Sequence, residues 1–177
     1  MKTSTILFTL AACISSTLAQ SGQATTTRYY DGLKGACGCG PSSGNSMFSW
    51  QSGIGTGIYT AAVSQALYDS GGSSWCGAGC GKCYTLTSTG NAPCSSCGTG
   101  GASGSSITVM ATNLCPNSGN AQWCAAVGGT NDYGYEYHFD IMAQSEVLGD
   151  NVVVDFEEVT CPSAALTDYA DCQCASS

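Results

Sequence analysis

Twelve cysteines constrain the fold of this chain more than any other feature of its sequence. The chain holds 13 cysteines. One of them, Cys13, lies in an N-terminal apolar stretch that we expect to be removed. The remaining even set runs from Cys37 to Cys174. An even set in an oxidising compartment is typical of a disulfide framework, so we predict six disulfides, with a pairing that the spacing leaves open.

A metal site is the alternative use of these cysteines. Cys76, Cys80 and Cys83, and separately Cys94 and Cys97, have spacings that zinc sites also use. Thiols of secreted proteins are usually oxidised, and the single histidine of the chain lies in a different segment. We therefore favour the disulfide framework and expect neither a metal nor another cofactor.

The N-terminus is typical of an exported protein. A positive start at Lys2, an apolar run over residues 6–13 and small residues up to Ala19 form the pattern of a secretory signal peptide. The apolar run is shorter than the roughly 20 residues that span a membrane. We predict a signal peptide over residues 1–19, a mature chain from Gln20, and secretion.

The mature chain, residues 20–177, has a length typical of one domain. Neither a Pro/Ser/Thr linker nor a second cysteine-rich module follows Cys174. We therefore expect a single catalytic domain that acts as a monomer, with no carbohydrate-binding module.

The patterns along the chain predict an all-β fold with one or two short helices. Runs rich in β-branched residues predict strands over residues 83–87, 107–112, 137–141 and 152–159, with Gly- and Ser-rich turns between them. A helix is predicted over residues 60–69, where Thr60 would cap it and glycines would end it. A second short helix is expected to start at Asn120.

The charge of the chain restricts its partners. Four basic residues stand against 12 acidic ones, which gives a net charge of −8. Loss of Lys2 with the signal peptide would make it −9. Such a balance argues against nucleic acids and anionic membranes. A neutral polymer such as a polysaccharide fits better.

Two carboxylates suggest a chemistry for such a partner. Asp31 ends the run Thr-Arg-Tyr-Tyr-Asp, and Asp140 ends the run Tyr-His-Phe-Asp. Hydrolysis of a glycosidic bond needs one carboxylic acid to protonate the leaving oxygen and one carboxylate to activate water or attack. Asp140 would stay protonated through burial against its aromatic neighbours, and Arg28 would help to keep Asp31 ionised. Alternation along a strand places His138 on the same side as Asp140, where it would bond to the acid or line the groove.

Four motifs, taken together, resemble a known family. They are Thr-Thr-Thr-Arg-Tyr-Tyr-Asp at 25–31, Cys-Gly-Ala-Gly-Cys-Gly-Lys-Cys-Tyr at 76–84, Val-Met-Ala-Thr-Asn-Leu-Cys-Pro at 109–116 and Tyr-His-Phe-Asp at 137–140. Their order and the cysteine frame resemble glycoside hydrolase family 45 endoglucanases, in particular a small fungal branch that is related to expansins. The resemblance implies a six-stranded double-psi β-barrel with an open substrate groove, and inversion at the anomeric carbon.

The same resemblance implies roles for single residues. Asp140 matches the general acid of the family and Asp31 its general base, and His138 would have a supporting role. Asn120 matches an asparagine that is proposed to handle the water in relatives without the first aspartate. Because Asp31 is present here, we expect Asn120 to position water or to cap a helix.

Sugar contacts are expected from aromatic side chains, on which the apolar faces of glucose stack. Tyr29 and Tyr30, next to Asp31, are the first candidates, together with Trp123, Tyr135 and the neighbouring Arg28. In an extended segment Tyr29 and Tyr30 point to opposite faces, so one of them should face the sugar and the other the barrel.

Three functions remain open from the sequence. The first is an inverting endo-β-1,4-glucanase acting on cellulose, lichenan or glucomannan. The second is an expansin-like protein that binds glucan and loosens cell walls without cutting, and the third is a barwin-like binding module on the same barrel. Asp31 favours the enzyme, because expansins lack an aspartate at this position and a protein without a base has no evident way to activate water.

Overall fold

A computed structural model describes residues 19–176 of the chain. The predicted signal peptide and Cys13 therefore lie outside the described residues, apart from Ala19 at the end of the peptide. Within the described range, none of the helices has the length and apolar character needed to cross a membrane.

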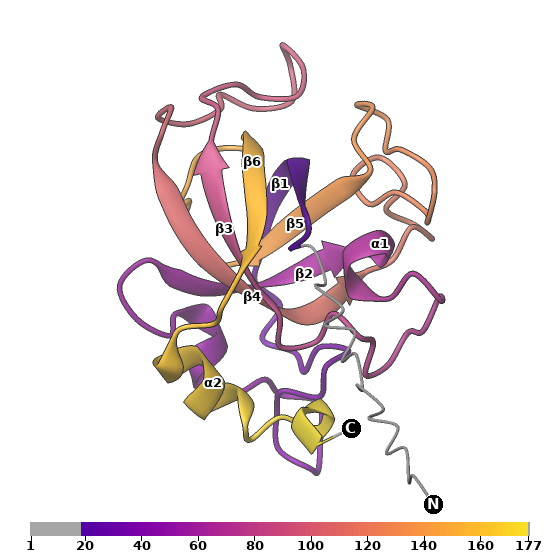
Figure 1. Ribbon diagram of the computed structural model, residues 1–177, viewed down its shortest axis with the longest axis vertical. Helices are drawn as coiled ribbons and strands as arrows, with labels where there is room; N and C mark the ends of the chain where they lie inside the picture. Colours follow the sequence, from indigo (N-terminus) through magenta and orange to yellow (C-terminus); the bar gives the residue numbers. More distant parts are fainter. Residues whose placement is uncertain (1–18, 177) are drawn as a thin grey trace, which may run out of the picture.

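Six strands close into a barrel in the order β1-β5-β2-β4-β3-β6 (Figure 1). The pairs β1–β5 and β2–β4 are parallel, and the other four pairs are antiparallel. This closed barrel confirms the predicted double-psi architecture. The strands are β1 (Ser21–Tyr29), β2 (Ile58–Ser64), β3 (Cys83–Ser88), β4 (Ser106–Cys115), β5 (Tyr137–Met142) and β6 (Val153–Val159).

The helical elements are short and lie outside the barrel. They are the α-helices α1 (Gln65–Tyr68) and α2 (Ser163–Tyr169) and the 3₁₀ helices η1 (Ser49–Ser52) and η2 (Gln173–Ser176). Helix α2 and the C-terminal segment lie below the barrel in Figure 1, and the loop between β3 and β4 lies above it.

Aromatic side chains from three strands fill the barrel interior. Tyr84 packs edge to face against Phe139 and Phe156, with ring centroids 5.3 and 6.0 Å away. Because side chains alternate along a strand, an inward Phe139 turns its neighbours His138 and Asp140 to the outer face of β5. The packing of the barrel core therefore decides which side of β5 carries polar groups.

The helix predicted over residues 60–69 is wrong in its first half. Strand β2 occupies Ile58–Ser64, and the helix α1 is limited to Gln65–Tyr68. Residues 60–64 of β2 are all buried, so both faces of the strand are covered. A buried strand carries consecutive apolar residues that periodicity does not separate from a helix. Thr60 donates its hydroxyl to the Gln51 carbonyl at 2.7 Å and caps no helix.

The second predicted helix is also wrong, because residues 117–124 form successive turns around Asn120. The four predicted strands are confirmed as β3, β4, β5 and β6, with shifts of up to three residues at their ends. Strands β1 and β2 complete the barrel that the family resemblance implied.

All twelve cysteines between Cys37 and Cys174 form disulfides, which confirms the predicted framework and rejects the zinc alternative. Three of the four long-range bridges, which we call the cystine cluster, tie the segment after β1 to the segment before β3 and to the C-terminal segment. The cluster consists of Cys37–Cys80, Cys39–Cys172 and Cys76–Cys174. The other bridges are Cys83–Cys161, Cys94–Cys97 and Cys115–Cys124.

Candidate active site

The candidate site lies on the outer face of the parallel pair β1–β5. In its register Thr25 stands opposite His138, and Thr27 stands opposite Asp140. The two strands are more than 100 residues apart in the sequence, since Thr25 and His138 are separated by 113 positions. Strand pairing therefore brings two hydroxyls beside an imidazole and a carboxyl group.

These groups form a continuous series of hydrogen bonds, which we call the hydroxyl–imidazole chain. The Asn131 side-chain amide donates to Thr25 Oγ1 at 2.9 Å. Thr25 Oγ1 lies 2.8 Å from His138 Nδ1, and His138 Nε2 lies 2.9 Å from Thr27 Oγ1. Thr27 Oγ1 donates to Asp140 Oδ1 at 2.6 Å. Two threonines and one histidine thus connect a buried amide to the candidate acid.

The direction of the donors follows from the two ends of this chain, Asn131 and Asp140. Its Oδ1 accepts the backbone N–H groups of Tyr133 and Tyr135, so its Nδ2 must face Thr25 as a donor. At the other end, Thr27 gives its only hydroxyl proton to Asp140 and must accept the Nε2–H of His138, so Nδ1 of the neutral ring accepts the Thr25 hydroxyl. Every donor in the chain therefore points toward Asp140.

Burial also fixes the charge of the imidazole. His138 is fully buried, which lowers its pKa to about 3. The ring is therefore neutral in mildly acidic and neutral solution. His138 reaches Asp140 through Thr27, which differs from the direct bond or groove position expected from sequence.

The pKa of Asp140 is raised, whereas that of His138 is lowered. Burial raises the pKa of Asp140 to about 6, the hydrogen bond from Thr27 opposes this rise, and the charge of Asp31 adds to it. The flanking aromatics do not supply the burial, because Phe139 points into the barrel and Tyr137 packs on Phe156 with ring centroids 5.1 Å apart. A carboxyl group with this pKa remains largely protonated in acidic solution.

Asp31 lies just after β1 and is exposed. Its Oδ1 accepts the Leu33 N–H at 2.9 Å, which orients the side chain within a turn. Arg28, which was expected to help keep Asp31 ionised, donates its guanidinium to the carbonyl oxygens of Ala143 and Gln144 at 3.4 and 3.3 Å. The two carboxyl groups therefore differ in surroundings: Asp140 is largely buried and Asp31 faces solvent.

A cavity of about 340 Å³ opens beside Asp140. Its lining residues come from β1, β5, the turn region before β5 and the loop after it; they are Thr27, Arg28, Trp123, Asp140, Glu146, Gly149, Asp150 and Asn151. Arg28 and Trp123, two of the residues expected to contact sugar, line the cavity. The segment from Glu146 to Asn151 was missed, since a loop without periodicity or motif gives no sequence signal.

The predicted tyrosines divide between core and surface. Tyr29 packs against the buried cluster of Ala62, Cys115 and Cys124, and burial raises the pKa of its phenol. Tyr30 is 46% exposed, so these neighbours point to opposite sides, as predicted. Tyr135 is partly buried and contributes its backbone N–H to Asn131. None of the three tyrosines is among the residues that line the cavity.

Asn120 lies away from the cavity lining. It is exposed, and its side-chain amide donates to the Pro116 carbonyl at 3.2 Å. Its own carbonyl accepts the N–H groups of Trp123 and Cys124 at 2.9 and 2.8 Å. In this structure Asn120 therefore supports the turn that carries Trp123.

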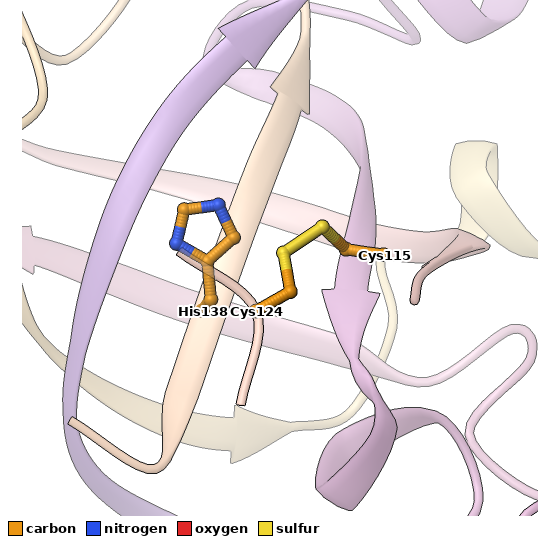
Figure 2. Close-up of side chains that lie close together, drawn as sticks. All are labelled: Cys115, Cys124 and His138. Carbon is orange, nitrogen blue, oxygen red and sulfur yellow. A yellow bond between two sulfur atoms is a disulfide. The ribbon is translucent and has the colours of Figure 1, made fainter. Parts of the chain in front are cut away.

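Cys115, Cys124 and His138 bring their possible ligand atoms within 4.8 Å of one another. Figure 2 shows the imidazole beside the disulfide that joins the two cysteines. Both ring nitrogens are bonded to threonine hydroxyls, so the group presents no unoccupied nitrogen or thiolate to a metal. The disulfide instead holds the turn with Trp123 over His138, at a ring separation of 5.8 Å.

Comparison with known proteins identifies relatives along nearly all of the described chain. The family described as EXPB1-like domain 1 matches residues 24–176. Endoglucanase-5 of Hypocrea jecorina is 73% identical over 152 residues, which are 86% of this chain and 62% of the relative. The chain thus spans less than two thirds of that relative. An endoglucanase of Mytilus edulis is 44% identical and covers 86% of this chain and 90% of its own length.

Solved structures agree with these sequence matches. The endoglucanase EG27II of glycoside hydrolase family 45, in complex with cellobiose, superposes with a TM-score of 0.80 at 39% identity. That match covers 89% of this chain and 90% of the other. The β-1,4-D-endoglucanase Cel45A of the blue mussel superposes with a TM-score of 0.76 at 41% identity, covering 88% and 92%.

Proposed function

This chain belongs to the glycoside hydrolase family 45 endoglucanases, and we propose that it is a secreted endo-β-1,4-glucanase that cleaves with inversion. The observation that carries the proposal is Asp140, a carboxyl group with a pKa raised to about 6, set in the wall of an open cavity. We further propose that residues 20–177 act as a single monomeric catalytic domain after removal of a signal peptide.

Asp140 is the general acid in this proposal. Its burial favours the protonated form, so the carboxyl group delivers a proton to the leaving glycosidic oxygen and becomes a carboxylate. Thr27 then donates a hydrogen bond to the new charge. The neutral imidazole and Asn131 hold that hydroxyl in place without changing charge themselves.

Asp31 is the general base. It is exposed to solvent, where it meets water, and its side chain is oriented by the Leu33 N–H. Inversion requires the base to activate a water on the opposite face of the sugar, which needs about 6.5 to 9.5 Å between the carboxyl groups. In the products, the proton from Asp140 resides on the leaving hydroxyl and the water proton on Asp31.

The substrate is proposed to be a neutral β-1,4-glucan such as cellulose, lichenan or glucomannan. EG27II is solved with cellobiose, a β-1,4-linked disaccharide. The cavity offers Trp123 for stacking and polar groups such as Arg28 for hydroxyls. The net charge of −8 disfavours anionic polymers.

Two measurements test the proposal. The mature chain should release reducing ends from soluble mixed-linkage glucan and shorten cellohexaose internally. Proton NMR of the first products should show the α-anomer, which then mutarotates. If the β-anomer appears first, or a glycosyl adduct forms on Asp31, the base is a nucleophile and the proposed role is wrong.

An expansin-like protein remains the second candidate, because the matching family is described as EXPB1-like domain 1. That function predicts glucan binding and wall loosening without reducing-end release. A protein that binds cellohexaose and leaves it intact for hours would favour the expansin-like function over hydrolysis.

A further inference from the structure

One part of the cavity wall is formed by residues 149–151, which we call the groove wall. It belongs to the loop between β5 and β6 and carries no regular structure beyond one bridge. A wall of this kind has little rigidity of its own. Its position must therefore depend on what lies behind it.

Behind the groove wall lies the loop between β3 and β4, which stands above the barrel in Figure 1. Gly100 and Asp150 exchange two backbone hydrogen bonds, of 3.0 and 2.8 Å. The Thr99 N–H also donates to Asp150 Oδ2 at 3.0 Å. We call residues 94–101 of this loop the brace.

The brace and the groove wall pack together through their backbones, with glycines at the points of closest approach. A Cβ atom added to Gly98 would lie 2.6 Å from the Asp150 carbonyl oxygen, and one added to Gly149 would lie 2.6 Å from the Gly100 oxygen. A Cβ atom on Gly101 would lie 2.4 Å from the Leu148 oxygen. Any side chain at these glycines would push the wall away from the brace.

Asn151 is the point where the brace holds the wall most directly. Its φ of +51° lies in the left-handed region, which is uncommon for a residue with a side chain. Its side-chain amide donates to the Cys97 carbonyl at 2.5 Å. Cys97 itself is fixed by the disulfide with Cys94, three residues earlier.

We propose that Asn151 is a positioning residue for the substrate, and that the Cys94–Cys97 disulfide fixes the carbonyl group that holds it. The proposal rests on the proposed glucanase function. It adds a role in substrate binding for the brace, which touches no reacting atom. The brace keeps the groove wall against the sugar, so its loss weakens binding of the glucan and leaves the acid and base in place.

The length of the disulfide ring supports a local role. In the chain-entropy description, the bridge over three positions makes the smallest contribution of the six to the free energy of unfolding. Cys94 and Cys97 are partly exposed and lie outside the barrel core. A bridge that adds so little to global stability, yet holds an acceptor for the groove wall, is better explained by positioning.

Three variants test the proposal. The double change Cys94→Ser with Cys97→Ser removes the bridge. Asn151→Gly permits the same backbone conformation and removes the amide, which separates the hydrogen bond from strain. Asn45→Gly changes an exposed asparagine in a different loop and is the matched control. Each is compared with wild type by hydrogen exchange of residues 148–153, thermal unfolding, and KM and kcat on cellohexaose.

We expect faster exchange at the Asp150 amide in the two test variants, together with a KM raised about 10-fold and a kcat within about twofold of wild type. Asn45→Gly should match wild type in every measurement. Unchanged exchange in the disulfide variant would overturn the brace, and faster exchange with an unchanged KM would overturn the role of the wall in binding. If wild type itself leaves cellohexaose intact, the proposed glucanase fails, while the exchange result still decides the brace.

Discussion

The cystine cluster and the groove wall use disulfides in opposite ways. The cluster joins residues that are 43, 133 and 98 positions apart, whereas the bridges near the groove span 3 and 9 positions. In the chain-entropy description the bridge over 133 positions contributes about 5 kcal/mol to the free energy of unfolding, and the bridge over 9 contributes about 2.6 kcal/mol. Long-range bridges thus stabilise the fold, and short ones shape the site.

The difference explains how the site tolerates unfavourable features. Asp140 is a largely buried carboxyl group, and Asn151 has a left-handed backbone. Each of these features destabilises the native state. The cystine cluster offsets this cost from a region that does not line the cavity, so changes in one region should leave the other nearly intact.

The substitution Asp140→Asn should have the largest effect on the site while leaving the cystine cluster intact. Removing the proton donor should lower kcat by about 10²- to 10⁴-fold. The melting temperature should stay equal or rise near neutral pH, because the variant no longer buries a charge. Initial rates of reducing-end release and calorimetry measure both effects. Asp171→Asn, at an exposed aspartate near the C-terminus, is the control, and near-wild-type turnover in Asp140→Asn would remove Asp140 from the mechanism.

The converse change is Cys39→Ser with Cys172→Ser. We expect the free energy of unfolding to fall by about 5 kcal/mol, because the unfolded chain regains the entropy of a long loop. At low temperature the kcat of the folded protein should equal that of wild type. Urea unfolding followed by tryptophan fluorescence, with assays below the transition, checks both statements. Activity that disappears before the unfolding transition would show that the two regions are coupled.

The ionisation of Asp140 should affect the pH dependence of both activity and stability. Activity should fall as the pH rises through about 6, since the acid loses its proton there. Because the folded pKa lies above the value of about 3.9 in an unfolded chain, Asp140 also makes the native state less stable as the pH rises from about 4 to about 6. This contribution is at most about 3 kcal/mol.

The measurement compares the melting temperatures of wild type and Asp140→Asn across this range. The difference between them should grow from pH 4 to pH 6 in favour of the variant. Parallel curves would mean that Asp140 has an ordinary pKa in the folded protein.

A smaller change tests the hydroxyl–imidazole chain. Thr27→Val keeps the shape of the side chain and removes the hydroxyl, so we expect kcat to fall about 10-fold through loss of one hydrogen bond to a charged group. Because that bond lowers the pKa of Asp140, the alkaline limb should move to higher pH. Thr27→Ser should restore both values. A limb that stays in place in Thr27→Val would leave Thr27 with a packing role.

The smallest effect is expected for Asn120→Ala. Asn120 is exposed and bonded to the Pro116 carbonyl, so kcat should remain within about twofold of wild type. A loss of more than tenfold, with an unchanged melting temperature, would give Asn120 a part in handling water.

The sequence predicted the site residues that lie in recognisable motifs better than the threonines of β1 that bond to them. The alternation in the Tyr-His-Phe-Asp run placed His138 and Asp140 on one face correctly, because that rule depends on β5 alone. The threonines of β1 were not assigned roles, since their position opposite His138 and Asp140 follows from a register between distant strands. The same limit explains why the pattern over residues 60–64 predicts a helix, since pairing with β4 and β5 on both sides makes this segment a strand.

Because the site depends on the pairing of β1 with β5, it forms only when both halves of the chain have folded into one barrel. The acid and the hydroxyl that serves it come from opposite halves of the chain, because Thr27 and Asp140 are 113 positions apart. A fragment from either half carries one group without the other. A chain cut in the loop between β3 and β4 should therefore gain turnover when its two pieces associate. The recovered rate would measure the fraction of the protein that has assembled into a closed barrel.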